Sequence, residues 1–244
     1  MARKRALVTG AAVRLGRAFA EHLAARGYDL VLHTNTRRAQ ADALAKTLRK
    51  KGLRIDVVQA DIARPVDVAA MFDAFPGRLD LVVNSAAMFE KAPFLELSDT
   101  QLAHMVLTNL LGPMLVCRHA AERMTRGGQI VNMLDIGALQ PWRGFAHYCS
   151  AKAGLAMLTR VLALELAPKI RVNGIAPGTV LIPESYTKAQ RRALAGSIPL
   201  GRVGQVEDVL RALDYLVDAE FITGTFQVVD GGRSQGEGGG SEVA

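Results

Sequence analysis

The sequence predicts an α/β fold, a doubly wound Rossmann-type parallel sheet of about seven strands with helices on both faces. Short apolar runs alternate along the chain with longer amphipathic segments. The short runs are continuously apolar, which is typical of strands buried on both faces of a parallel sheet. The length of 244 residues suits one domain of this kind.

Strand and helix are expected to alternate from the N-terminus. A strand at Ala6–Thr9 is followed by a helix over Leu15–Ala25, and a strand at Asp29–His33 is followed by a helix over Arg38–Lys51. Further strands are expected at Ile55–Val58, Leu79–Val83, Gln129–Met133, Ile170–Asn173 and Gln227–Val229. Two helices, around Leu102–Arg118 and Leu155–Leu166, are apolar on more than one face, which predicts burial against other subunits.

The chain shows no internal repeat and no linker, so residues 1–233 are predicted to form a single dinucleotide-binding catalytic domain. From Gly231 onward the sequence is rich in glycine and serine, and residues 234–244 are predicted to be a flexible tail. The segment Val180–Gly204, in which Pro183 and Pro199 bracket a helical stretch, is predicted to be a substrate lid.

Composition excludes several classes of protein. Half of the residues are hydrophobic and 22% are charged, which excludes a disordered chain. No run approaches the roughly 18 apolar residues of a membrane-spanning helix. The net charge of +7 is spread along the chain and aromatics make up only 5%, so a small polyanionic ligand is favoured over nucleic acid. Two cysteines suit a reducing cytoplasm.

The first strand is predicted to meet the first helix at Thr9–Gly16. A pyrophosphate bound there meets free backbone N–H groups and the positive end of the helix. Gly10 allows a tight turn, and Gly16 allows close approach of the backbone. The spacing is not G-x-G-x-x-G, and on this motif alone a glycine turn without a ligand stays open.

The end of the second strand favours NADP(H). A cofactor with a free ribose 2′-OH requires an Asp or Glu about 20 residues after the glycines, whereas this chain has His33, Asn35, Arg37 and Arg38 among the residues there and no acid. Two guanidinium groups suit a 2′-phosphate. The alternative is that both arginines only begin an exposed helix, where cations are unfavourable unless an anion joins them.

Four polar residues form a candidate catalytic set. Tyr148 and Lys152 stand four apart, so on a helix they share one face. A neighbouring ammonium is expected to lower the pKa of the tyrosine and make it a proton donor near neutral pH. Asp135 lies thirteen residues before Tyr148 at a strand end, and Asn109 lies in the apolar segment Leu107–Cys117. Taken one at a time, each of these four residues also fits an ordinary structural role without catalysis.

The motifs together resemble the short-chain dehydrogenase/reductase family over residues 4–233. The resemblance implies a cofactor site made by the following residues: Gly10, Arg14, Leu15, Gly16, His33, Asn35, Arg37, Arg38, Asp61, Ile62, Asn84, Ser85, Ala86, Tyr148, Lys152, Pro177 and Gly178. Asp61 and Ile62 are expected to contact the adenine, although Asp61 equally suits a turn. The family's usual serine is replaced by Asp135, and the usual middle glycine of the first turn by Arg14.

Both departures are shared by the pteridine reductases and the similar dihydromonapterin reductases, which this chain resembles. The resemblance implies that Phe89 stacks on a pterin, that Asp135 pairs with its N–H groups, and that Arg14 bridges the cofactor phosphates and the pterin oxygen. Tyr148 is then the proton donor, Lys152 holds the nicotinamide ribose, and Asn109 supports a water beside Lys152. Ala87 and Met88 depart from the polar residues of that subgroup. For Phe89, plain core packing is the alternative.

The predicted function is reduction of a pterin by hydride from NADPH, in a cytoplasmic homotetramer that binds no metal, nucleic acid or membrane. The first alternative is an NADPH-dependent carbonyl reductase acting on a ketone, sugar or acyl thioester. The second is an NADP-binding sensor without catalysis, against which the Tyr148–Lys152 pair argues, because a sensor does not require a tuned phenol.

Overall fold

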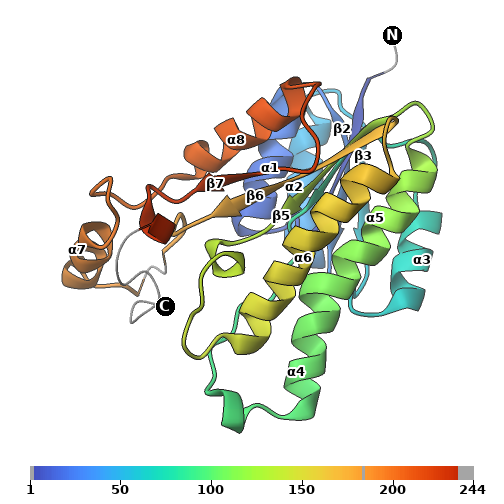
Figure 1. Cartoon of the computed structure of the whole chain (residues 1–244). Coiled ribbons are helices and arrows are strands. Elements are labelled where there is room, and N and C mark those ends of the chain that lie inside the picture. The colour runs from blue at the N-terminus through green and yellow to red at the C-terminus, as the bar shows by residue number, and fades with distance from the viewer. Residues whose placement is uncertain (1–2, 183–184, 236–244) are drawn as a thin grey trace.

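Seven parallel strands form one sheet through the centre of the molecule, in the order β3-β2-β1-β4-β5-β6-β7 (Figure 1). The computed structural model describes residues 3–182 and 185–235. The strands are β1 (Arg5–Val8), β2 (Asp29–Thr34), β3 (Ile55–Gln59), β4 (Leu81–Asn84), β5 (Gly128–Met133), β6 (Ile170–Pro177) and β7 (Phe226–Val229). This arrangement confirms the predicted fold class.

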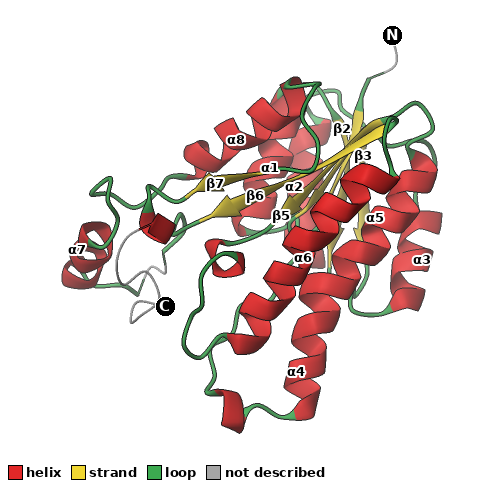
Figure 2. Ribbon diagram, in the orientation of Figure 1, coloured by secondary structure: helices red, strands yellow, loops and turns green. Residues whose placement is uncertain are grey.

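Helices cover both faces of the sheet (Figure 2). They are α1 (Arg14–Ala25), α2 (Arg38–Arg49), α3 (Pro65–Asp73), α4 (Asp99–Val106), α5 (Gly112–Arg123), α6 (Ala146–Glu165), α7 (Lys188–Gly196) and α8 (Val206–Asp218). One core contains buried side chains of α1, α2 and α8, and the other contains those of α3, α5 and α6. In β1, Ala6 and Val8 belong to the first core and Leu7 to the second. Consecutive residues of β1 therefore face opposite cores, which is why Ala6, Leu7 and Val8 are all apolar.

The longest helical run, residues 99–123, joins α4 to α5 through a π-helical turn at Leu107–Leu111. Its length and its mean hydropathy of 1.2 meet the criteria for a membrane span, which the sequence was not expected to contain. In the structure α5 packs against α3 and β4, and the π-helical turn packs against α6. Part of the run is therefore buried within the fold, including Met105 and Val116, whereas Val106 and Met114 are exposed.

Three segments in the C-terminal part of the chain can be compared in detail with the prediction. Strand β6 continues to Pro177, past its predicted end at Asn173. The predicted lid contains α7, which confirms its helical stretch, and Pro183 lies outside the described residues. Ser234 and Gln235, predicted as the start of the tail, lie in a short 3-10 helix, Arg233–Gln235, and residues 236–244 lie outside the described part.

Candidate active site

A cleft of about 800 Å³ opens where the strands of the sheet end, within the range of about 300–1,000 Å³ that small-molecule sites occupy. Most of the predicted site residues line it: Gly10, Arg14, Leu15, Gly16, His33, Asn35, Arg37, Asp61, Ile62, Ser85, Ala86, Phe89, Asp135, Tyr148, Lys152, Pro177 and Gly178. Three others, Arg38, Asn84 and Asn109, do not line the cleft. A ligand beyond the carboxyl ends of the strands is the arrangement expected of this fold.

The turn between β1 and α1 depends on two glycines. Gly10 has φ of +67°, a left-handed conformation in which glycine is strongly favoured. A Cβ on Gly16 would lie 2.1 Å from the carbonyl oxygen of Gly10, so the helix can approach the turn only at a glycine. Helix α1 begins without a side-chain cap or an acidic residue in its first turn. Its free N–H groups fit a phosphate.

His33 fixes this turn from the second strand. Its Nδ1 accepts from the Gly10 N–H at 3.2 Å, and Nε2 lies 3.0 Å from the carbonyl of Ala60. Because a carbonyl only accepts, the ring is neutral with its proton on Nε2. Burial lowers the pKa of His33 to about 4. The imidazole therefore acts as an uncharged brace for the backbone of the turn.

Of the two arginines after β2, only Arg37 lines the cleft. Arg38 does not line the cleft and bonds to Asp42 one turn further along α2, at 3.0 and 3.1 Å, so the structure does not support its predicted place in the cofactor site. Helix α2 also begins without a side-chain cap or an early acid. The guanidinium of Arg37 and this helix end therefore bring positive charge to the cleft beside β2.

Asp61 has the turn role that the sequence left open, and its contact with an adenine stays a prediction. It lines the cleft with Ile62, and its Oδ1 accepts from the N–H of Ala63 at 3.0 Å. The turn therefore holds a carboxylate at the rim of the cleft, with Ile62 beside it.

Asp135, Tyr148 and Lys152 come together at the ends of β5 and α6. The Tyr148 hydroxyl donates to Oδ2 of Asp135 at 2.9 Å, and the Gly137 N–H donates to Oδ1 at 2.8 Å. Lys152 donates from Nζ to the carbonyl of Met133 at 2.8 Å, and its Nζ lies 5.8 Å from the centre of the Tyr148 ring. Tyr148 and Lys152 are both buried. The predicted convergence of phenol, ammonium and carboxylate is present.

The electrostatics of this group differ from the prediction for Tyr148. Burial raises the pKa of Tyr148 well above its ordinary value, and the charge and hydrogen bond of Asp135 raise it further. The expected lowering by Lys152 is therefore overcome. Burial also raises the pKa of Asp135 and lowers that of Lys152 to about 8. The three pKa shifts have the same main cause: burial removes water from the charged form of each group and so disfavours it.

Asn84 and Asn109 have internal partners instead of a place on the cleft. Asn84 donates to Oδ1 of Asn132 at 2.9 Å, which ties β4 to β5. Asn109, in the π-helical turn, accepts from the N–H of Met88 at 3.1 Å and donates to its carbonyl at 3.0 Å. The structure thus places the Asn109 side chain against the loop that carries Phe89, where it fixes the backbone, and its support of a water beside Lys152 stays a prediction.

Phe89 belongs to a group of aromatic rings at the reactive end of the cleft. It is 55% exposed, stacks on Phe145 at 4.8 Å, and meets the ring of Tyr148 edge-on at 4.9 Å. This exposure contradicts plain core packing. Trp142 lies parallel to Tyr148 at 6.4 Å, and the missing side chain of Gly137 leaves room for its indole. Trp142 and Phe145 were not predicted.

Arg233 is a further residue that the sequence did not single out. It lines the cleft, donates to Oγ1 of Thr179, and is near enough for mutual attraction with Asp135. It directly follows Gly231 and Gly232 in the turn after β7, and this pair of glycines is the one local signal that could have pointed to it.

Comparison with known proteins identifies the family of the chain. A sequence profile described as Enoyl-(Acyl carrier protein) reductase matches residues 10–234. The chain is 35% identical to 3beta-hydroxysteroid dehydrogenase 1 of Eggerthella lenta, over 95% of this chain and 94% of that protein. It is 34% identical to carbonyl reductase family member 4 of Danio rerio, over 93% and 96%. The chain belongs to the short-chain dehydrogenase/reductase family.

The fold comparison leads to the same family. A crystal structure of a protein assigned as a short-chain alcohol dehydrogenase from Sinorhizobium meliloti 1021 superimposes with a TM-score of 0.88 at 28% identity, covering 95% of this chain and 96% of that one. As a member of the short-chain dehydrogenase/reductase family, the protein is an oxidoreductase that uses a nicotinamide cofactor. The glycine turn, the uncapped α1 and the Tyr148–Lys152 pair fit that cofactor.

Proposed function

We propose that the protein is an NADPH-dependent reductase whose substrate is a pterin or a closely similar nitrogen heterocycle. The observation that supports this best is the carboxylate of Asp135, which accepts from the Tyr148 hydroxyl at 2.9 Å beside the exposed ring of Phe89. A carboxylate only accepts hydrogen bonds, so it favours a substrate that presents N–H donors over one that presents a bare carbonyl oxygen.

Each residue then has a defined task. When bound, the nicotinamide cofactor supplies the hydride. The N-terminus of α1 and Arg37 bind its phosphates, and Lys152 holds its ribose. Phe89 and Trp142 provide apolar surface for a flat ring, while Asp135 orients the ring through its N–H groups. Tyr148, whose raised pKa keeps it protonated, donates the proton that the reduced ring requires.

Cofactor choice has a matched pair of variants in the two neighbouring arginines. Arg37→Met removes the guanidinium that lines the cleft, and we expect it to raise the KM for NADPH at least about tenfold with little change for NADH, as for a lost charge-assisted contact. Arg38→Met removes a guanidinium that bonds to Asp42 instead, so it serves as the control. Equal effects of the two variants on NADPH would contradict the assignment.

Substrate class is tested with biopterin, dihydrofolate and a set of small ketones. We expect the pterins to be reduced, and Asp135→Ser to lose this activity by about 100-fold or more because serine carries no charge to pair with N–H donors. Tyr148→Phe is expected to abolish most turnover while NADPH still binds. Turnover of ketones alone, unchanged in Asp135→Ser, would refute the pterin proposal.

The second candidate is an NADPH-dependent carbonyl reductase, favoured by the names of the relatives in Danio rerio and Eggerthella lenta. The same panel separates the two candidates, since this enzyme would reduce ketones in preference to pterins. An NADP-binding sensor would bind NADPH and consume none on any substrate.

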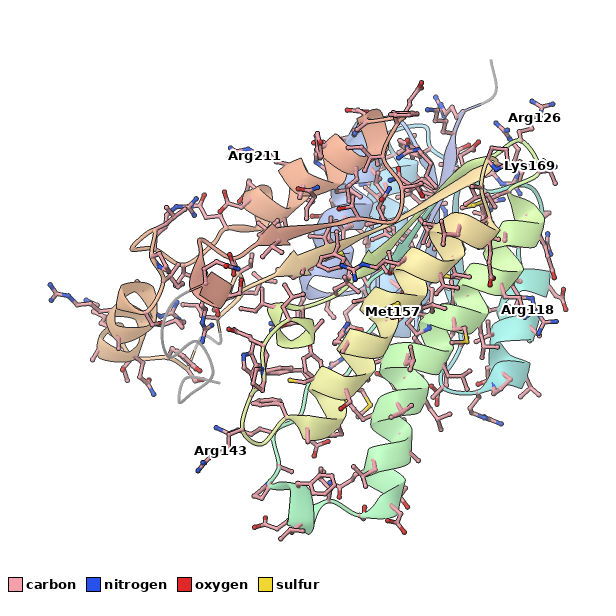
Figure 3. All side chains as sticks on the ribbon, in the orientation of Figure 1. Arg118, Arg126, Arg143, Met157, Lys169 and Arg211 are labelled. Carbon is pink, nitrogen blue, oxygen red and sulfur yellow. The ribbon has the colours of Figure 1, made fainter. Side chains whose placement is uncertain are left out.

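We also propose a cytoplasmic homotetramer. Its support is apolar surface on two long helices: Met114 on α5, and Met157, Val161 and Leu164 on α6, are exposed in the single chain. Figure 3 shows Met157 on the outward side of α6. Light scattering coupled to size-exclusion chromatography tests the assembly, and a monomer at micromolar concentration would contradict it.

A further inference from the structure

Two arginines hold the segment Thr179–Ile182, which follows β6. Arg233 donates from Nη1 to Oγ1 of Thr179, and Arg14 donates from Nη2 to the carbonyl of Leu181 at 3.2 Å. The segment and both arginines line the cleft. The two guanidinium groups come from opposite ends of the chain, one from the β1–α1 turn and one from the turn after β7.

Arg14 occupies a backbone conformation that disfavours its side chain. Its φ is +52°, and it is the sole non-glycine residue with positive φ among residues 3–182 and 185–235. A left-handed backbone is unfavourable for any residue with a Cβ, and a glycine would remove that strain. Strain at a cleft-lining residue indicates a function for its side chain. The bond to Leu181 is a contact that glycine could not make.

Arg233 is fixed by the turn that carries it. The two carboxylate oxygens of Asp230 accept from the N–H groups of Gly232 at 2.8 Å and Ser234 at 2.7 Å. The turn is also linked to the residue that precedes the segment Thr179–Ile182, because the Gly178 N–H donates to the carbonyl of Val229 at 2.9 Å. The backbone that carries Arg233 is thus held by hydrogen bonds on both sides of the residue, which fixes the position from which its guanidinium contacts Thr179.

Arg233 also faces the proposed reactive group. The half-buried carboxylate of Asp135 is near Tyr148, Cys149 and Lys152 of α6 and near Arg233. The positive charges of Lys152 and Arg233 both lower the pKa of Asp135 against the effect of burial. Arg233 therefore links the segment 179–182 with the acid at the reactive end of the cleft.

We propose that Arg233 is a positioning residue that, with Arg14, holds the segment 179–182 against the reactive end of the cleft and adds its positive charge to that of Lys152 facing Asp135. The inference goes beyond the proposed function and does not rest on which substrate is reduced.

Hydrogen exchange in the full-length protein tests the positioning without any substrate. The Gly204 N–H donates to the carbonyl of Thr179 at 3.0 Å and reports on how firmly the segment is held. We expect this amide to exchange about fivefold faster in Arg233→Met and in Thr179→Val, the factor that corresponds to one lost hydrogen bond. The double variant should exchange no faster than Arg233→Met, and Arg233→Lys should retain most of the protection.

Kinetics separate the role of charge from that of the hydrogen bond. With the best available substrate, Arg233→Met should lower kcat and move the acid limb of its pH profile to higher pH, because the pKa of Asp135 rises when the cation is lost. Arg233→Lys keeps the positive charge and should leave the acid limb at its wild-type pH. Thr179→Val and Arg14→Gly should lower kcat without moving it. Arg211→Met, an exposed arginine of α8 (Figure 3), serves as the control.

The outcomes decide the proposal without reference to pterins. Unchanged exchange at Gly204 in Arg233→Met would overturn it, as would exchange in the double variant well above that of either single variant. An equal shift of the acid limb in Thr179→Val would overturn the part assigned to charge. If Arg233→Met fails to fold, Thr179→Val and Arg233→Lys supply the same tests. Failure of the pterin assay alone would leave these results standing.

Discussion

Replacing Lys152 by methionine is expected to stabilise the protein at neutral pH while it inactivates the enzyme. The buried ammonium has its pKa lowered from 10.5 to about 8, chiefly by loss of water. At about 1.4 kcal/mol per pKa unit, the charged form costs the fold roughly 3 kcal/mol at pH 7. Methionine removes the charge and loses the bond from Nζ to Met133, worth about 1.5 kcal/mol or more. The net expectation is a gain of about 1–2 kcal/mol.

The sign of this effect depends on pH. A depressed folded-state pKa means that stability is greatest when the lysine is neutral, above its unfolded pKa of 10.5, and is lost as pH falls to about 8. The gain in unfolding free energy of Lys152→Met over wild type should therefore be largest at pH 7 and disappear by pH 10.5. Urea denaturation at the two pH values measures it. Lys46→Met, an exposed position on α2, is the control, and a variant at residue 152 less stable than wild type at pH 7 would refute the reasoning.

Three further predictions concern the supports of the site. Gly16→Ala should abolish cofactor binding and lower the unfolding free energy by about 1–3 kcal/mol, because its Cβ would meet the carbonyl of Gly10. Gly196→Ala is the control: its Cβ would meet nothing within 4 Å, so the unfolding free energy should not change. The neutral His33 should make stability fall by roughly 3 kcal/mol as pH drops from 6.5 to about 4, and denaturation of His33→Leu should lack this slope. Asp135→Asn should gain stability over wild type as pH rises from 4 to 7, since burial raises the pKa of that carboxyl; a constant difference in urea midpoint would contradict this.

Local spacing was enough to predict the centre of the site. Tyr148 and Lys152 share a helix face, and Asp135 follows a strand that the apolar pattern located, so the parallel fold brings all three to one edge. The position of Arg38 outside the cleft had a local signal as well. Asp42 stands four residues later on the same helix, and such pairs attract each other across one turn.

Other parts of the site depend on tertiary contacts that no spacing encodes. Asn109 is polar within an apolar run, which predicts a partner but not its identity; the π-helical turn directs it to the backbone of Met88. Trp142 lies parallel to the ring of Tyr148 because Gly137 has no side chain to occupy the space of the indole. Arg233 reaches Thr179 from the far end of the chain. Each contact is fixed by packing between distant segments.

The partners of the Tyr148 hydroxyl limit the chemistry that this centre favours. Its proton is directed at Asp135, and both the bond and the charge of that carboxylate make the phenol a weaker acid. A ligand that offers an N–H to Oδ2 of Asp135 replaces the phenol there, so the hydroxyl is released toward the ligand and its acidity increases. A plain ketone has no donor with which to do this. For the proposed nitrogen-heterocycle substrate, binding would thus itself activate the proton donor, and we therefore expect the residue at position 135, more than the shared tyrosine and lysine, to decide the substrate.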